Sequence, residues 1–243
     1  MLYGIISDIH ANQEALEECL QRLKGKVDKI ICLGDIIGYG PNPNECCEMI
    51  RELNIPSIAG NHEKAVLGEL ELTWFNQNAR SALHWTQKEL SEDNKNFIYQ
   101  LPNALVYEKF QIVHGSLINP IEEYMDSLNV AIPSFEKMAK NLLLVGHTHM
   151  PIFFTRKTDG NYDGGAITGD ENIYLGEYDR VIVNVGSVGQ PRDGDPRAAY
   201  GILNDEKAEI SVHRISYDIA KTQEKMRNAL LPDSLIERLS LGN

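Results

Sequence analysis

Short apolar runs, each followed at once by polar residues, recur in the first 63 residues of the chain. Residues 2–7, 27–33 and 55–59 have the composition of buried strands, and residues 12–23 and 44–53 carry apolar side chains at helical spacing. Strands that alternate with helices predict an α/β fold, in which ligands bind at the carboxyl ends of the strands. The polar residues that follow these runs are therefore the first candidates for a functional site.

Residues 142–151 strengthen this interpretation. Four apolar residues predict a buried strand, and Gly146 after them allows the backbone to turn sharply. His147 and His149 lie two residues apart, so in extended geometry we expect both imidazoles to point the same way, into one metal cluster. Alone, the pair is equally compatible with two hydrogen-bonded polar histidines.

The polar residues at the predicted strand ends form one chemically consistent set. They are Asp8, His10, Asp35, Asn61, His62, His114, His147 and His149. The two remaining histidines, His84 and His213, are expected to be ordinary surface or core residues. Carboxylate, imidazole and amide donors suit Mn, Fe, Zn, Co or Ni, and the set is larger than one tetrahedral zinc ion can use. Each residue alone is more typical of a loop or helix cap, but together they predict two divalent ions that share a carboxylate.

Five short motifs within this set follow a fixed order. They are Asp8-x-His10, Gly34-Asp35, Gly60-Asn61-His62-Glu63, His114-Gly115 and Gly146-His147-Thr148-His149. In this order and spacing they resemble the motifs of the calcineurin-like metallophosphoesterase superfamily. The resemblance implies a four-layer α/β/β/α sandwich, in which two mixed β-sheets are flanked by helices.

The same resemblance implies a role for each residue. It assigns one ion to Asp8, His10 and His149, the other ion to Asn61, His114 and His147, and the bridge between them to Asp35. It further implies that a hydroxide bridging the ions attacks phosphorus, while His62 donates a proton to the leaving group as the general acid. Either Asp35 or Glu63 is expected to keep His62 charged, although Glu63 has the simpler interpretation of a favourable charge at a helix start.

The residues after the second motif narrow the class. Ile36-Ile37-Gly38-Tyr39 stands where Ser/Thr protein phosphatases carry an Asp-Arg pair. Residues 7–12, 38–43 and 184–192 are instead similar to small bacterial and archaeal phosphodiesterases, some of which cleave diadenosine polyphosphates or cyclic nucleotides. We therefore expect a phosphodiesterase acting on phosphodiester or nucleotide phosphoanhydride bonds. The alternatives are a dedicated diadenosine polyphosphate (Ap4A-type) hydrolase and a non-catalytic metal-binding scaffold of the same fold.

Two residues outside the motifs are candidates for substrate binding. Arg192 lies in a Gly/Pro-rich turn, where its guanidinium has the donors to bind a second phosphate or a base. Alternatively, it pairs with Asp193 or Asp195 to hold the turn. Tyr39 is expected either to stack on a nucleobase or to act as a packing lid. Residues 184–187 are expected to shape the turn and to hydrogen-bond to metal ligands.

Composition limits the partners of this site. The chain has 243 residues, of which 42% are hydrophobic, and this suits a single domain over residues 1–243. A formal net charge of -12 argues against duplex nucleic acid and anionic membranes as partners. Two divalent ions held by two aspartates leave the site itself at about +2, which attracts a small phosphorylated or nucleotide substrate. Manganese is the ion expected to support activity in vitro.

The expected cellular location and cysteine chemistry follow from motifs that the sequence does not contain. No apolar run has the length of a membrane span and no signal peptide is evident, so a cytoplasmic protein is expected. The four cysteines, Cys19, Cys32, Cys46 and Cys47, form no C-x-x-C pair and are expected to be reduced core thiols.

The remaining segments predict covering helices and further strands. Two or three helices are expected between residues 63 and 100, and others at 132–140 and 217–230. Short strands are expected at 105–107, 110–113, 152–156, 180–185, 198–203 and 209–215. The Gly- and Asp-rich excursion over residues 159–170 has no predicted role.

Overall fold

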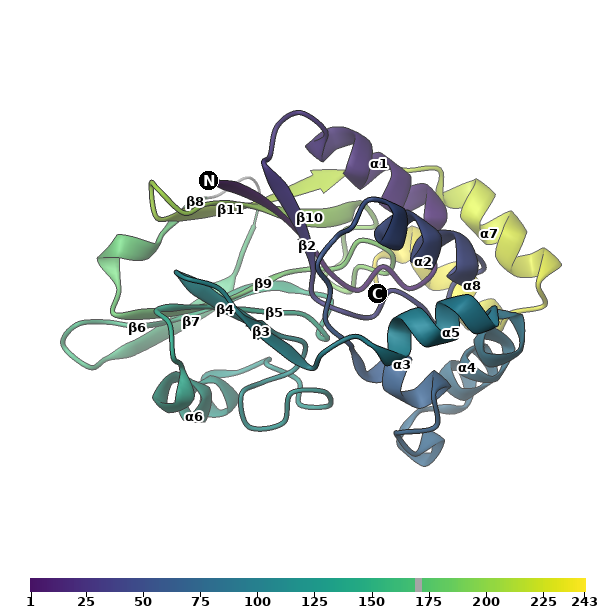
Figure 1. The fold of residues 1–243 in the computed structure, drawn as a ribbon, viewed down its shortest axis with the longest axis horizontal. Helices are drawn as coiled ribbons and strands as arrows, with labels where there is room; N and C mark the ends of the chain where they lie inside the picture. Colours follow the sequence, from purple (N-terminus) through teal and green to yellow (C-terminus); the bar gives the residue numbers. More distant parts are fainter. Residues whose placement is uncertain (169–171) are drawn as a thin grey trace.

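The computed structural model describes residues 1–168 and 172–243, which form two β-sheets packed face to face and covered by helices (Figure 1). Within these residues one sheet has five strands, in the spatial order β2 (Lys29–Cys32), β1 (Leu2–Ile6), β10 (Ala198–Asn204), β11 (Glu209–Ile215) and β8 (Asn172–Tyr174). The other has six, in the order β3 (Ala104–Val106), β4 (Phe110–Val113), β5 (Leu142–Val145), β9 (Arg180–Val185), β6 (Pro151–Arg156) and β7 (Tyr162–Ala166).

Both sheets are mixed. In the five-stranded sheet β1 pairs with β2 in parallel and with β10 in antiparallel orientation. In the six-stranded sheet β4, β5 and β9 run parallel, whereas β6 is antiparallel to β9. Because parallel neighbours end at the same edge, the loops that follow β1, β2, β4, β5 and β9 meet at one end of the sandwich.

The alternation of side chains along β5 explains why this strand is apolar throughout. Leu142 and Leu144 lie in the core between the sheets, with Ile5 of β1. Leu143 and Val145 point outward and pack under the helix α6 (Leu128–Lys137). A strand buried on both faces needs apolar residues at every position, and this is the pattern that the sequence shows.

Helices cover the outer faces of both sheets. α1 (Gln13–Leu23) and α2 (Pro43–Glu52) pack on the five-stranded sheet, and α6 packs on the six-stranded sheet. α1 begins where the Asn12 side chain accepts a hydrogen bond from the backbone N–H of Ala15, and it buries Leu16, Leu20 and Leu23 at helical spacing. The predicted four-layer α/β/β/α sandwich of two mixed sheets is therefore confirmed.

The other helices gather at the end of the sandwich where the parallel strands terminate (Figure 1). They are α3 (Asn61–Val66), the short 3-10 helix η1 (Leu72–Trp74), α4 (Gln77–Glu89), α5 (Glu92–Tyr99), α7 (Ile219–Asn228) and α8 (Asp233–Leu241). A second 3-10 helix, η2 (Leu175–Glu177), precedes β9. The prediction of two or three helices between residues 63 and 100 is confirmed by α3, α4 and α5.

Two predicted segments are corrected by the structure, and a strand is found in a third segment that had no predicted role. Residues 55–59 are not a strand but make one parallel bridge, from Ser57 to Cys32, because Pro56 has no N–H to extend the ladder and Ala59 bonds to Pro102 instead. The helix expected at 132–140 starts one turn earlier and ends at Lys137. The excursion over residues 159–170 contains β7, which pairs with β6, while residues 169 and 170 lie outside the described residues.

Two further expectations concern the interior and the membrane. All four cysteines are buried free thiols, as predicted. Across the part of the chain that the structure describes, no helix combines the length and the apolar character that crossing a bilayer requires.

Candidate metal centre

The side chains predicted to bind metal converge at the end of the sandwich where the parallel strands stop. They follow β1 (Asp8 and His10), β2 (Asp35), β4 (His114) and β5 (His147 and His149), and one begins α3 (Asn61). Each of them is at most 7% exposed. The structure thus brings together residues that are up to 141 positions apart in the sequence, from Asp8 to His149.

Carboxylate and imidazole atoms form two overlapping groups there. One group contains Asp8, His10, Asp35 and His149, the other contains Asp35, His114 and His147, and in each the ligand atoms lie within 4.8 Å of one another. Oδ2 of Asp35 is 3.3 Å from Nε2 of His114 and 3.6 Å from Nε2 of His10. One carboxylate oxygen therefore reaches both groups, as a bridging aspartate must, and two divalent ions are compatible with this set of donors.

Each predicted histidine ligand is oriented by contact with a backbone carbonyl oxygen. The contacts join Nδ1 of His10 to Ile37 (3.1 Å), Nδ1 of His114 to Leu33 (2.8 Å), Nδ1 of His149 to Gln190 (2.6 Å) and Nε2 of His147 to Glu122 (3.2 Å). Because a carbonyl oxygen only accepts, each contact places a proton on that nitrogen and leaves the second nitrogen of the neutral ring for an ion. His147 therefore offers Nδ1, whereas the other three offer Nε2.

Several of these atoms are poorly satisfied by the protein alone. Within the described residues, Oδ1 of Asn61 is buried without a hydrogen-bond partner, and Oδ2 of Asp35 and Nε2 of His114 are buried with only each other nearby, at 3.3 Å. Nε2 of His10 and Nε2 of His149 face each other at 3.0 Å, and with both protons on Nδ1 this contact joins two lone pairs. Buried polar atoms without partners are unfavourable, and cations held among these donors relieve both problems. The residues therefore fit a pair of divalent ions.

Burial and charge act in opposite directions on the pKa of His114. Burial lowers it, but the Asp35 carboxylate beside it outweighs burial and raises the pKa to about 10. Burial likewise raises the pKa of Asp35, yet His114 and His62 hold it well below its ordinary value. Burial dominates at His147, where it lowers the pKa to about 3, and at Asp8, where it raises the pKa to about 6. Binding an ion between Asp35 and His114 therefore releases a proton.

The loops that carry the ligands adopt backbone conformations that L-residues rarely use. The φ angle is 52° at Asp8, 48° at His10, 52° at Asp35, 68° at His147 and 61° at His149. Such residues cost on the order of 1–3 kcal/mol each and cluster at functional sites. The expectation that His147 and His149 lie in extended geometry is therefore wrong, although both imidazoles reach the same centre. Their left-handed backbone sends the two imidazoles into different groups, which Asp35 connects.

Glu63 organises the loop that presents Asp35. Its carboxylate accepts hydrogen bonds from the backbone N–H groups of Asp35 (2.9 Å), Ile36 (2.8 Å), Ile37 (3.2 Å) and Gly60 (2.7 Å). A Cβ atom at Gly60 would lie 2.1 Å from Oδ1 of Asp35, so this close approach requires glycine. Glu63 thus does more than favour the start of α3, and its contact with the loop of residues 35–37 was not predicted.

His62 lies beside the ligands without belonging to either group. Its side chain is 2% exposed, and its ring packs against Tyr39 (4.4 Å between centroids), His10 (4.6 Å) and Phe75 (5.4 Å). Burial lowers the pKa of His62 to about 4, although Asp35 opposes this. The expectation that Asp35 or Glu63 keeps the His62 ring charged is therefore wrong for the free residue, because burial outweighs the effect of Asp35. Oδ1 of Asp35 instead accepts the backbone N–H of His62 at 2.9 Å.

The two candidate substrate residues pack against each other. Nη2 of Arg192 lies 3.0 Å from Oε1 of Gln190 and 3.5 Å from the Tyr39 hydroxyl, and its guanidinium sits 5.7 Å from the centre of the Tyr39 ring. Tyr39 is 8% exposed and covers His10 and His62, which favours the packing lid over stacking on a base.

The alternative that Arg192 pairs with a nearby aspartate is wrong. Asp193 pairs with Arg214, and Asp195 pairs with Arg197 at 2.6 Å. Among the ion pairs of residues 1–168 and 172–243, none includes Arg192, and its Nε atom is buried without a partner there. Its guanidinium therefore has donors left for a ligand, as the first interpretation requires.

The turn after β9 supports the ligands, as predicted. The Ser187 hydroxyl donates to the Asp8 carbonyl at 2.8 Å and accepts the Gln190 backbone N–H at 2.8 Å. The same Gln190 supplies the carbonyl that orients His149. Nδ2 of Asn184 donates to Thr148 Oγ1 at 2.9 Å, which holds the loop between His147 and His149.

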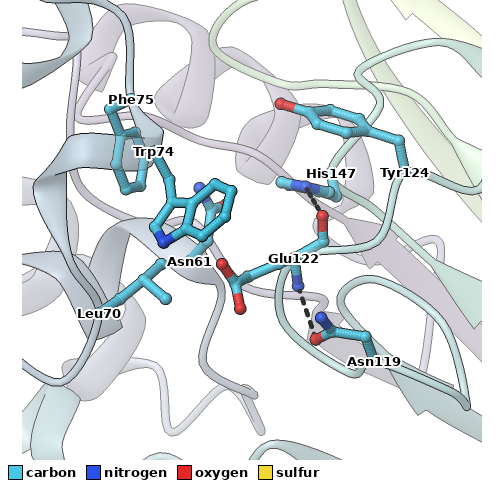
Figure 2. Close-up of a pocket in the computed structure, with 8 residues that line it drawn as sticks. All are labelled: Asn61, Leu70, Trp74, Phe75, Asn119, Glu122, Tyr124 and His147. Carbon is cyan, nitrogen blue, oxygen red and sulfur yellow. Dashed lines mark hydrogen bonds between the residues drawn. The ribbon is translucent and has the colours of Figure 1, made fainter.

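A cleft of about 510 Å³ opens beside the centre and was not predicted from the sequence (Figure 2). We call it the aromatic cleft, and its lining residues are Asn61, Leu70, Trp74, Phe75, Asn119, Glu122, Tyr124 and His147. Trp74 and Phe75 form one wall, and Tyr124, stacked on His147 with centroids 3.9 Å apart, forms the opposite wall. Asn61 begins α3 and Trp74 ends η1, whereas the other residues come from connecting segments, and the 78% exposure of Trp74 appears only in the folded chain.

Comparisons with known proteins agree with this geometry. The family model described as the calcineurin-like phosphoesterase superfamily domain matches residues 1–207. An uncharacterized protein from Methanocaldococcus jannaschii is 40% identical over 248 residues, which cover 99% of this chain and 98% of that protein.

Two solved structures are also similar. The crystal structure of a metallophosphoesterase from Sphaerobacter thermophilus shares 42% identity with a TM-score of 0.89, covering 100% of this chain and 99% of that one. A hypothetical protein from Pyrococcus horikoshii shares 21% identity with a TM-score of 0.80, covering 100% and 98% of the two chains, and so shares the fold.

Proposed function

The chain belongs to the calcineurin-like phosphoesterase superfamily, and from this premise we propose that it is a dinuclear metal-dependent phosphodiesterase, acting on phosphodiester or nucleotide phosphoanhydride bonds. Membership of the family implies a phosphoric ester hydrolase. One observation carries the finer proposal: two buried groups of carboxylate and imidazole atoms meet at Asp35, and His62 lies beside them without joining either.

The two groups support one assignment of ligands, to which the family resemblance adds Asn61. Asp8, His10 and His149 would hold one ion, Asn61, His114 and His147 the other, and Asp35 both. Two divalent ions there supply Lewis acidity toward a phosphoryl group and a water that is acidic enough to act as a nucleophile near neutral pH. Manganese is our candidate for supporting activity in vitro.

Local charge explains how an acidic protein attracts an anionic substrate. The formal net charge of the chain is -12, which disfavours polyanions such as duplex nucleic acid over most of the surface. Around Asp8 and Asp35 the loaded site carries about +2, because the histidines and Asn61 contribute no charge. A small phosphorylated or nucleotide substrate is therefore drawn to the strand ends and to few other places.

His62 is the residue proposed to donate a proton to the leaving oxygen. Its ring packs between Tyr39 and Phe75 next to His10, and among the described residues its Nδ1 atom has no hydrogen-bond partner. Burial lowers the pKa of the free residue to about 4, and an anionic phosphate arriving beside the ring favours the protonated form. General acid help of this kind contributes roughly 10²–10⁴-fold to the rate.

Arg192 favours a substrate that has more than one phosphate. Its guanidinium lies over Tyr39, which covers the metal-ligand side chain of His10, and its Nε atom is free among the described residues. A dinucleoside polyphosphate, the substrate of an Ap4A-type hydrolase, would place a second phosphate within reach of these donors. This observation makes a diadenosine polyphosphate hydrolase the second candidate.

Metal removal tests the proposal directly. We expect that dialysis against a chelator abolishes hydrolysis of bis-p-nitrophenyl phosphate, and that added Mn²⁺ restores it. Metal content is measured by elemental analysis, and circular dichroism checks that the fold persists in the stripped protein. Full activity of the metal-free protein, or binding of two ions without any phosphodiester hydrolysis, would contradict the proposal; the second outcome would point to a metal-binding scaffold.

A further inference from the structure

We propose that the aromatic cleft binds a nucleobase of the substrate, an inference that rests on the proposed phosphodiesterase function. The cleft is lined by His147 of the metal centre and by the predicted ligand Asn61, so a group lying in the cleft would be next to a phosphate bound at the centre. At about 510 Å³ the cleft is far larger than a phosphate needs and lies in the size range of small-molecule pockets.

The walls of the cleft are flat rings that continue into the catalytic side chains. Tyr124 is stacked on His147, with ring centroids 3.9 Å apart and an angle of 20° between the ring planes. On the other wall Phe75 meets the His62 ring edge to face at 5.4 Å. Trp74 stands next to Phe75 and projects into the cleft (Figure 2). A planar heterocycle between Trp74 and Tyr124 would thus lie against the residues that handle the phosphate.

The exposure of the Trp74 and Tyr124 rings fits a role in stacking on a base. Trp74 is 78% exposed and Tyr124 is 48% exposed, whereas the predicted metal ligands are nearly inaccessible. An exposed tryptophan contributes little to the core, but it offers a stacking face to any base because every base has a π-face. Its position at the mouth of a cleft that leads to the metal centre indicates a ligand rather than a packing role.

Glu122 gives the cleft its polar edge. The backbone of Glu122 is fixed at both ends, since its N–H donates to Asn119 Oδ1 at 3.2 Å and its carbonyl contacts Nε2 of His147. Its carboxylate points into the cleft, and among the described residues no hydrogen bond or ion pair to it is formed (Figure 2). A carboxylate accepts hydrogen bonds from the N–H groups at the edge of a base and repels a second phosphate. The occupant is therefore a neutral heterocycle.

Binding measurements isolate the contribution of the base. Guanosine 5′-monophosphate and ribose 5-phosphate share a phosphate and a sugar and differ in the base alone. In calorimetry with the Mn²⁺-loaded protein, we expect guanosine 5′-monophosphate to bind about tenfold more tightly than ribose 5-phosphate. This ratio corresponds to the free energy that one stacked base contributes. Trp74→Ala should bring the two dissociation constants within about twofold of each other by removing the stacking face. Tyr99→Ala, which removes a comparably exposed tyrosine at the end of α5, should preserve the difference.

A fluorescence signal gives a second readout that is independent of turnover. Trp85 is the only other tryptophan, so Trp85→Phe leaves Trp74 as the sole emitter. Its emission should be quenched by guanosine 5′-monophosphate and unchanged by ribose 5-phosphate. Equal affinities for the two ligands in the unmodified protein would overturn the inference. So would a Trp74→Ala variant in which the affinities for both ligands fall by the same factor.

The two proposals fail separately. Loss of the base preference in a protein that still hydrolyses bis-p-nitrophenyl phosphate with Mn²⁺ would reject the cleft and keep the phosphodiesterase. A preference for the nucleotide that depends on Trp74, in a protein without metal-dependent hydrolysis, would reject the phosphodiesterase and keep the base site.

Discussion

The metal centre and the aromatic cleft adjoin each other, but they are built in opposite ways. Every predicted ligand is at most 7% exposed, and each histidine ligand is held through a backbone carbonyl. The outer side chains of the cleft are exposed instead, Trp74 by 78% and Tyr124 by 48%. A centre that holds two ions needs fixed donors, whereas a surface that selects a substrate needs only a shape and a few contacts. Under the two proposals, substitutions in the metal centre and in the cleft should therefore have different consequences.

The largest effect is expected at the bridge. Asp35→Ala removes the one carboxylate that reaches both groups, so we expect both ions to be lost on dialysis and hydrolysis to disappear. The loss should exceed the roughly 10–100-fold that follows mutation of an outer partner of a metal ligand. Elemental analysis and assays with Mn²⁺ measure it, with Asp93→Ala, an exposed aspartate of α5, as the control. Retention of two ions by Asp35→Ala would show that the two groups do not depend on a shared ligand.

A smaller effect, confined to turnover, is expected at His62. His62→Ala should keep both ions, because this ring belongs to neither group, and should lower kcat by about 10²–10⁴-fold. The loss should be greatest for alkyl leaving groups, which need a proton, and smallest for p-nitrophenolate. His84→Ala, at an exposed position of α4, is the matched control. An unchanged kcat on a diester with a poor leaving group would remove the acid role.

The smallest effect is expected at Arg192, on the side of the centre that carries Tyr39. Arg192→Ala should raise KM for dinucleoside polyphosphates by roughly tenfold, the value of one hydrogen bond to a charged group, and leave small aryl diesters within about twofold. Arg197→Ala removes an arginine that is already paired with Asp195 and serves as the control. Equal increases of KM for both kinds of substrate would show that Arg192 shapes its turn without contacting a second phosphate.

The sequence predicted the chemistry of the centre better than its geometry. Strands such as β9 and β11 have the predicted bounds, because short apolar or alternating runs fix them locally. The ligand residues were found because their side chains follow such strands. The left-handed backbone of His147 and His149 was not predicted, because this loop meets distant segments only in the folded chain, where the backbone N–H of His147 donates to the Asp8 carboxylate at 3.1 Å.

The cleft shows the same limit more strongly. Trp74 and Tyr124 come from segments 50 residues apart, and neither belongs to a motif or to a helix or strand with a periodic pattern. Their approach is a result of tertiary folding, through the stacking of Tyr124 on His147 and the packing of Phe75 on His62. Local patterns cannot indicate a pair of residues that meet only in the folded chain.

The buried carboxylate of Glu63 has a consequence for how the protein acquires its ions. It joins the loop of residues 35–37 to Gly60 through backbone N–H groups, with no participation of the side chains that would hold a cation. Loops joined in this way should keep their conformation in the metal-free protein, so that one divalent cation can be exchanged for another without refolding. The cation recovered with the purified protein would then reflect the supply in the host cell and not a preference of the polypeptide.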